Sequence, residues 1–269
     1  MGILTGKKGI ITGALNEKSI AWKVAEKCIE EGAEVILTNT AVSIRMGNIE
    51  ELAAKIGCKV VPADATSMED LAVLVDTAME TFGGQFDFVL HSIGMSPNVR
   101  KNKPYDALDY NLMNKTLDIS AISFHKLLQT LRQKDALKEW GSVVALTYIA
   151  AERTFAGYGD MADAKALLQS IARSFGMIYG AEKHIRVNTV SQSPTATTAG
   201  QGIAGMEAML KYADRMSPLG NATADDCANY VVTLFSDYTR KVTMQNLYHD
   251  GGFSSVGLTA AEVATFPTE

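Results

Sequence analysis

GIITGALNEKSIAWKVAEKCIEEGAEVILTN, residues 9–39, has a short apolar run at each end and a longer amphipathic stretch between them. Within that stretch Ile20, Val24 and Cys28 recur at the spacing of one helix face, and Gly32 stands where such a helix would end. A strand, a helix and a second strand in this order form a βαβ unit, whose two strands run parallel. The segment therefore predicts the beginning of a parallel sheet.

The same alternation continues along nearly the whole chain. The expected strands are residues 9–12, 34–39, 59–63, 86–92, 142–147, 185–191 and 243–249. Short, continuously apolar strands separated by helices are typical of a parallel sheet that is covered on both faces. We therefore expect an α/β fold, a Rossmann-like doubly wound parallel sheet of about seven strands with helices on both faces.

No linker, repeat or low-complexity tract divides the sequence, so we expect a single domain over residues 1–269. One segment departs from the alternation. Residues 194–211, PTATTAGQGIAGMEAMLK, follow the sixth expected strand and are rich in Gly, Ala and Thr. We expect this segment to be a lid or an inserted helical flap.

The composition excludes several classes of protein. With 47% apolar and 20% charged residues, a net charge of -5 and no dense Lys/Arg run, the chain predicts a soluble globule without a nucleic-acid or membrane partner. No apolar run approaches the roughly 20 residues of a membrane span, and the N-terminus lacks the pattern of a signal peptide. Cys28, Cys58 and Cys227 fit neither a metal site nor a disulfide framework, so we expect free thiols, no metal and a cytoplasmic protein.

The loop after the first expected strand, TGALNEKSIA, has features of a phosphate-binding turn. Gly13 would let the backbone approach a ligand closely, and the helix that begins near Ser19 would offer unpaired N–H groups to a pyrophosphate. The usual G-x-G-x-x-G pattern is absent. A plain turn in which Ser19 caps the helix is therefore the alternative.

Two further strand ends point to the same edge of the sheet. Asp64 follows the third expected strand, where its carboxylate would reach an adenine amino group or, alternatively, cap the helix that starts near Ser67. Gly94 follows the fourth, where it would leave room for a nicotinamide ribose. After the second strand no carboxylate and no cation precedes Arg45, which favours NADH over its phosphorylated form.

Tyr158 and Lys165 lie just before and inside a long expected helix, beyond the end of the fifth strand. Seven residues at about 1.5 Å each separate them by roughly 10 Å along the axis, so they would meet only at a group bound between them. The alternative is a packed ring and a solvated amine. A second pair, Tyr179 and Lys183, falls at the far end of the helix and is expected to be structural. His91 is likewise expected to be a hydrogen-bonded structural ring.

These motifs resemble the short-chain dehydrogenase/reductase superfamily and, within it, the NADH-dependent enoyl-acyl-carrier-protein reductases of bacterial fatty-acid synthesis. The resemblance covers essentially the whole chain. It is carried by TGALNEKSIA, HSIG, LTYIAAER, IRVNTVSQSP and HDGGF, and by the Tyr-x6-Lys spacing, since ordinary members of the superfamily have Tyr-x3-Lys.

The resemblance implies roles for particular residues. Tyr158 would stabilise the enolate oxygen, Lys165 would hold the nicotinamide ribose, and Tyr148 would line the pocket beside them. Implied contacts to NADH or NAD fall on Gly13, Ser19, Ile20, Thr40, Asp64, Ala65, Ile93, Lys165, Thr195, Ala196, Thr197, Thr198 and Ala199. The substrate would lie against Ser96, Tyr148, Tyr158 and Met161; Met206, Met209 and Met216 would either join this acyl pocket or belong to the core.

Some positions depart from the family pattern. Gln192 and Ser193 stand where relatives have a glycine, and Thr195 and Ala196 replace the usual Ile and Arg, so the lid's pyrophosphate contact would depend on neighbouring threonine hydroxyls. The implied partner is acyl carrier protein bearing enoyl thioesters, and the implied assembly is a homotetramer. A carbonyl reductase of the same superfamily and a non-catalytic dinucleotide sensor are the alternatives.

Overall fold

The structure is a computed structural model that describes residues 2–198, 200 and 205–266. The strands are β1 (Lys8–Thr12), β2 (Glu34–Asn39), β3 (Lys59–Pro62), β4 (Phe86–His91), β5 (Leu137–Thr147), β6 (Arg186–Gln192) and β7 (Asn246–His249). The α-helices are α1 (Ile20–Glu30), α2 (Ala41–Met46), α3 (Ile49–Ile56), α4 (Met68–Phe82), α5 (Pro97–Arg100), α6 (Tyr110–Leu117), α7 (Ser123–Gln133), α8 (Asp160–Lys183), α9 (Met206–Met216), α10 (Ala224–Phe235) and α11 (Ala260–Val263).

The strands form one parallel sheet of seven, in the order β3-β2-β1-β4-β5-β6-β7. The predicted fold class is therefore confirmed. The chain winds outward in one direction through β1, β2 and β3 and then returns to place β4 beside β1. This reversal creates a crevice at the carboxyl ends of β1 and β4, which is where open α/β sheets bind ligands.

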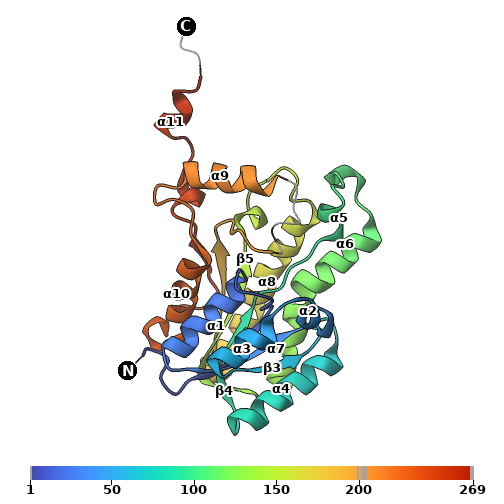
Figure 1. Cartoon of the computed structure of the whole chain (residues 1–269), viewed down its shortest axis with the longest axis vertical. Helices are drawn as coiled ribbons and strands as arrows, with labels where there is room; N and C mark the ends of the chain where they lie inside the picture. Colours follow the sequence, from blue (N-terminus) through green and yellow to red (C-terminus); the bar gives the residue numbers. More distant parts are fainter. Residues whose placement is uncertain (1, 199, 201–204, 267–269) are drawn as a thin grey trace.

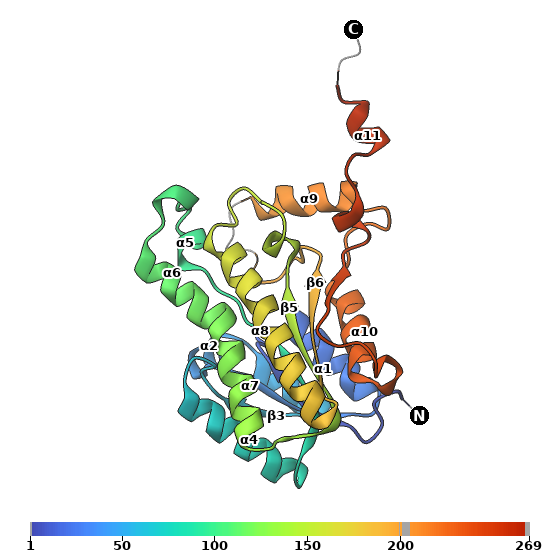
Figure 2. The same ribbon diagram turned by 180° about the vertical axis from the view of Figure 1, so that it is seen from behind.

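Helices cover both faces of the sheet because successive side chains of a strand point to opposite faces. Ile10 belongs to the core formed with α4, α7 and α8, whereas Ile11 belongs to the core formed with α1, α3 and α10. Figure 1 has α1 beside α10 on its near side, and Figure 2, seen from behind, brings α7 and α8 to the front. None of the helices within the described ranges combines the length and apolar content that a membrane span requires.

Two strands begin more than one residue away from their predicted starts. β5 begins at Leu137 rather than at residue 142, because it carries extra residues between Leu137 and Ser142, which pair with Phe86 and Phe88 of β4, and pairing therefore extends across a polar stretch that lacks a strand pattern. β7 begins at Asn246 rather than at residue 243, because Met244 has a φ of 61°, which ends the extended conformation.

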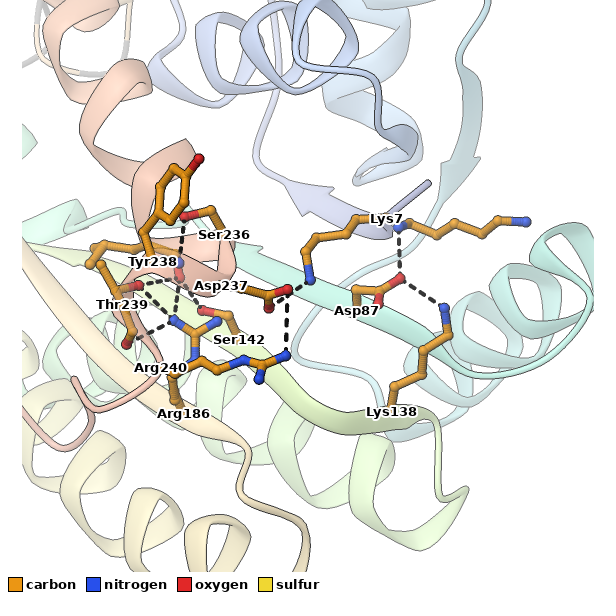
Figure 3. A network of polar contacts seen from close by, with 12 residues as sticks. Lys7, Asp87, Lys138, Ser142, Arg186, Ser236, Asp237, Tyr238, Thr239 and Arg240 are labelled. Atoms are coloured by element: carbon orange, nitrogen blue, oxygen red, sulfur yellow. Dashed lines mark hydrogen bonds and ion pairs between the residues drawn. The ribbon is translucent and has the colours of Figure 1, made fainter. Parts of the chain in front are cut away.

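Polar contacts close the amino-terminal edge of the sheet (Figure 3). The buried Arg186 guanidinium donates through Nη1 to the carbonyl oxygens of Leu234 at 2.8 Å and Thr239 at 3.2 Å and to the Thr239 hydroxyl at 2.7 Å. Nearby, Lys7 pairs with Asp237 at 3.1 Å. These side chains hold β6 and β1 to the turn that follows α10.

At the opposite edge, α9 and α5 stand above the carboxyl ends of the strands (Figure 1). α9 begins inside the predicted lid, residues 194–211, and continues past it to Met216. After β7 the chain runs past α9 and ends in α11, which extends away from the sheet in both views (Figures 1 and 2).

Candidate active site

Two connected cavities lie at the carboxyl edge of the sheet. The larger, which we name the groove, has a volume of about 610 Å³ and follows the ends of β1, β2, β3 and β4. The smaller, which we name the pocket, has a volume of about 210 Å³ and lies between the ends of β4, β5 and β6 and the helices α8 and α9. Ile93, Gly94 and Met95 line both cavities, so a ligand in the groove would extend to the pocket.

The turn after β1 is built around Gly13. Its φ is 87°, and a Cβ at this position would lie 2.0 Å from the carbonyl oxygen of Ser92. The glycine is therefore required for the protein's own close approach of β1 to β4, in addition to any approach to a ligand.

Ser19 occupies the N-cap position of α1, but its side chain does not cap the helix. Its hydroxyl instead accepts from the backbone N–H groups of Leu15 at 3.1 Å and Asn16 at 3.0 Å, which folds the loop back on itself. The capping alternative is therefore wrong for the side chain. Ser19 and Ile20, at the start of α1, line the groove, and the helix has no serine side-chain cap, which suits an anionic ligand.

The outer part of the groove is lined by the residues that follow β2 and β3. Thr40 caps α2 by accepting from the Ser43 N–H at 3.2 Å. Asp64 accepts from the N–H and the hydroxyl of Thr66, at 2.8 and 2.7 Å, whereas Ser67 caps α4. The alternative in which Asp64 caps α4 is therefore wrong.

Tyr148 and Tyr158 face the pocket together. Tyr148 follows β5 directly, and its ring centroid lies 5.1 Å from that of Tyr158. The Tyr148 hydroxyl contacts the sulfur of Met209 on α9 at 3.6 Å. Within the described residues no hydrogen bond involves the Tyr158 hydroxyl, so its donor is available to a group in the pocket.

Burial raises the pKa of Tyr158 above its usual value near 10. Tyr158 is a neutral hydrogen-bond donor at physiological pH.

Lys165 lies on α8 with its amine inside the protein. Its Nζ donates to the carbonyl oxygen of Leu146 at 2.9 Å, and Lys165 as a whole is 8% exposed. Burial lowers the pKa of Lys165 to about 8. A Cβ on Gly94 would lie 3.5 Å from this Nζ, so a larger side chain at position 94 would enter the space beside the amine.

His91 lies behind this site and lines neither cavity. Its Nε2 is 2.9 Å from the Ser123 hydroxyl, and its ring packs against Phe124 at 5.1 Å. Because the Ser123 hydroxyl donates to the carbonyl oxygen of Ile119, it accepts from His91. Burial, assisted by the charge of Lys165, lowers the pKa of His91 to about 3. The prediction of a structural ring is confirmed.

The structure brings most of the predicted site residues to the two cavities. Those that line the groove are Gly13, Ser19, Ile20, Thr40, Asp64, Ala65, Ile93, Thr197 and Thr198. Those that line the pocket are Ile20, Ile93, Ser96, Tyr148, Tyr158, Met161, Lys165, Thr195 and Thr197, together with Met206 and Met209. Ala196 is exposed and lines neither cavity, Met216 is buried away from them, and Ala199 lies outside the described residues.

The first loop and the predicted lid touch each other across the groove. Asn16 donates through Nδ2 to the Thr198 hydroxyl at 2.8 Å, although 182 positions separate the two residues. Thr197 lines both cavities. The lid segment therefore borders the path between groove and pocket.

Sequence reasoning assigned no site role to several residues of this region, including Arg100, Gln192 and Asp160. Arg100 lines both cavities and Gln192 lines the pocket, while Asp160 holds the pocket wall from behind. Asp160 gave no distinct signal, because an aspartate in a first helical turn is ordinary. Only its burial sets it apart.

The chain matches, over residues 13–254, the family described as Enoyl-(Acyl carrier protein) reductase. It is 32% identical to a curated protein of Rhizobium meliloti strain 1021 named enoyl-acyl-carrier-protein reductase (NADH) 2, over 97% of this chain and 96% of that protein. It is 35% identical to the enoyl-acyl-carrier-protein reductase (NADH) FabI of Rickettsia conorii, over 96% of this chain and 98% of that protein.

Solved structures give the same result. The FabI–NADH complex from Alistipes finegoldii is 69% identical, with a TM-score of 0.96 over 98% of this chain and 94% of that chain. The enoyl-acyl-carrier-protein reductase (NADH) from Aquifex aeolicus VF5 is 29% identical, with a TM-score of 0.89 over 96% of this chain and all of that one, 100%. The structural similarity therefore covers nearly the whole chain.

Proposed function

The chain belongs to the enoyl-(acyl carrier protein) reductase family, and on this basis we propose that it reduces the trans-2 double bond of enoyl thioesters on acyl carrier protein with NADH. This reaction is the last reductive step of fatty-acid elongation. The observation that carries the proposal is the convergence of Tyr148, Tyr158 and Lys165 on a pocket that opens into a dinucleotide-sized groove.

The groove suits NADH in shape and chemistry. It combines a glycine turn, a helix N-terminus and the open space at Gly94 beside the amine of Lys165. We propose contacts to NADH or NAD from Gly13, Ser19, Ile20, Thr40, Asp64, Ala65, Ile93, Lys165, Thr195, Thr197 and Thr198. Ala196 is exposed outside both cavities and is not among them. The ammonium of Lys165 would hold the nicotinamide ribose by charge-assisted hydrogen bonds.

The side chains of the pocket suit the reduction of a conjugated thioester. Bound NADH supplies a hydride to the β-carbon of the substrate. Negative charge then develops on the thioester oxygen, where the neutral Tyr158 hydroxyl donates a hydrogen bond. A proton taken up from solvent at the α-carbon completes the reduction. Ser96, Tyr148 and Met161 would line the substrate. The hydroxyl of Ser96 already donates to Asp160, so its contribution would be shape rather than a hydrogen bond.

We further propose that the chain is one dinucleotide-binding and catalytic domain in which residues 194–211 form the substrate lid. The contact between Asn16 and Thr198 supports this, since it joins the lid to the phosphate-binding turn. A homotetramer in the cytoplasm is our proposal for its assembly and location. Exposed small residues along α8, Ala166, Ser170 and Ser174, would let the helix of a second copy approach closely.

A side-by-side assay tests the function. Purified protein is mixed with NADH or NADPH and with a crotonyl or an acetoacetyl thioester, and the loss of reduced-nicotinamide absorbance is followed. We expect oxidation of NADH with the crotonyl substrate. Oxidation only with the acetoacetyl substrate would make the protein a carbonyl reductase, and tight NADH binding without turnover of either would make it a sensor.

A further inference from the structure

Asp160, the first residue of α8, is a fully buried carboxylate behind the wall of the pocket. Its Oδ1 accepts from the Ser96 hydroxyl at 2.5 Å. Its Oδ2 accepts from the Asn98 side-chain amide at 2.8 Å. The Thr116 hydroxyl lies 3.0 Å from Oδ2 and 3.0 Å from the carbonyl oxygen of Leu112, and its single proton is shared between these two acceptors. One carboxylate thus joins the N-cap of α5, α5 itself, α6 and α8.

No cation pairs with Asp160 among the residues that the structure describes. A buried charge without hydrogen bonds would be strongly unfavourable. Here the Ser96 hydroxyl, the Asn98 amide and the shared Thr116 hydroxyl satisfy its oxygens, and the positive end of the α8 dipole lies beside it. Moving any one of these donors away would leave a buried oxygen of Asp160 with one hydrogen bond fewer. The residues around Asp160 therefore resist displacement.

The residues that precede Asp160 connect this arrangement to the reacting centre. Gly159 has a φ of 52°, and a Cβ there would lie 3.2 Å from Cγ2 of Val99. The chain therefore turns sharply against the pocket wall between Asp160 and Tyr158. Ser96, Val99 and Tyr158 all line the pocket, whereas Asp160 lines neither cavity.

We propose that Asp160 is a positioning residue of the active site. It fixes the pocket wall from Ser96 to Val99 relative to the Tyr158 backbone. It thereby determines the orientation in which the thioester carbonyl oxygen accepts from the Tyr158 hydroxyl. Asp160 itself touches neither substrate nor NADH. This inference rests on the proposed function and adds a determinant of substrate orientation to it.

The Asp160→Asn substitution tests the proposal. An amide accepts hydrogen bonds on one side only, so its NH₂ group must face either Ser96 or the pair of Asn98 and Thr116. We expect the KM for a crotonyl thioester to rise and kcat to fall, with a loss in kcat/KM of about tenfold or more, since small displacements at a reacting centre have large effects. The Kd for NADH, measured by calorimetry, should stay within about twofold of wild type because the groove is untouched.

Ser142→Ala is the matched control. The buried Ser142 hydroxyl donates to the carbonyl oxygen of Leu234 at 2.9 Å, at the amino-terminal edge of the sheet (Figure 3). This variant also loses one buried hydrogen bond and lowers stability, but its kinetic constants should equal those of wild type. Wild-type thioester kinetics in Asp160→Asn, or an equal loss in Ser142→Ala, would overturn the positioning role.

Thr116→Val provides a second route if Asp160→Asn fails to fold. Thr116 lines neither cavity, so its substitution can change the KM for the thioester only through its hydrogen bond with Asp160. We expect the same rise in KM with a smaller amplitude, about twofold to fivefold. Unchanged KM and kcat in this variant would contradict the proposal. If wild-type protein does not oxidise NADH with any enoyl thioester, the proposed function has failed instead.

Discussion

The two ends of α8 carry the same pair of residue types in different surroundings. Tyr158 and Lys165 lie at its amino end, beside the pocket, and Tyr179 and Lys183 lie at its carboxyl end. The Tyr179 hydroxyl donates to the carbonyl oxygen of Leu128 at 2.8 Å. Lys183 pairs with Asp135 at 2.6 Å and donates to the carbonyl oxygen of Leu137 at 2.7 Å. The prediction that the second pair is structural is confirmed.

Burial does not separate the two tyrosines, since it raises the pKa of both Tyr158 and Tyr179. The difference lies in what their hydroxyls meet. At the carboxyl end the protein's own backbone satisfies the donor, whereas at the amino end the donor faces a cavity. A raised tyrosine pKa is therefore found at both ends of α8. Only the hydroxyl that faces a cavity without a hydrogen-bond partner among the described residues distinguishes Tyr158 as the candidate catalytic residue.

The largest expected effect that separates the two ends is on turnover. Tyr158→Phe should lower kcat with a crotonyl thioester by about a hundredfold or more, because it removes one donor to the developing oxyanion. Its Kd for NADH should stay at the wild-type value. Steady-state kinetics and calorimetry measure the two quantities, and an unchanged kcat would remove Tyr158 from the mechanism.

The next effect concerns the two lysines. Lys165→Met should weaken NADH binding by about tenfold to a hundredfold, since a charge-assisted hydrogen bond is worth about 1.5–3 kcal/mol. Lys183→Met should leave NADH binding unchanged, because this amine is committed to Asp135. Calorimetry on both variants checks the contrast, and equal affinities would contradict the assignment of Lys165 to the ribose.

A smaller, pH-dependent effect follows from the lowered pKa of Lys165. In the free protein its amine is charged below pH 8 and neutral above it. NADH affinity should therefore fall several-fold as the pH rises from about 7 to about 9.5, because the neutral amine still donates a hydrogen bond but loses the contribution of its charge. The same titration on Lys165→Met should be flat over this range. A parallel decline in both proteins would place the titrating group elsewhere.

The smallest effect belongs to the carboxyl end. Tyr179→Phe should lower the free energy of unfolding by about 1 kcal/mol, through the lost bond to Leu128. Turnover should not change. Urea denaturation followed by circular dichroism, with the enoyl thioester assay on the same preparation, measures both, and a loss of turnover comparable with that of Tyr158→Phe would erase the distinction between the ends.

Much of the fold could be predicted from local patterns. Seven strands were predicted and all seven are present, because an apolar run between helical stretches reports burial on both faces of a sheet. The errors at β5 and β7 arose where pairing or a backbone angle, rather than composition, sets the end of a strand. The carboxyl-edge clustering of Gly13, Asp64 and Gly94 followed from parallel topology alone.

Side-chain periodicity and strand direction are local properties, so the residues alone predicted the sheet, the succession of strands and helices, the group of residues at the carboxyl edge and the structural role of Tyr179. The folded structure was needed to show that the Ser19 hydroxyl folds a loop instead of capping a helix, and that Asp160 is buried behind the pocket. The first outcome depends on the backbone geometry of the loop and the second on the contact of Asp160 with the distant Ser96, and residue spacing reveals neither.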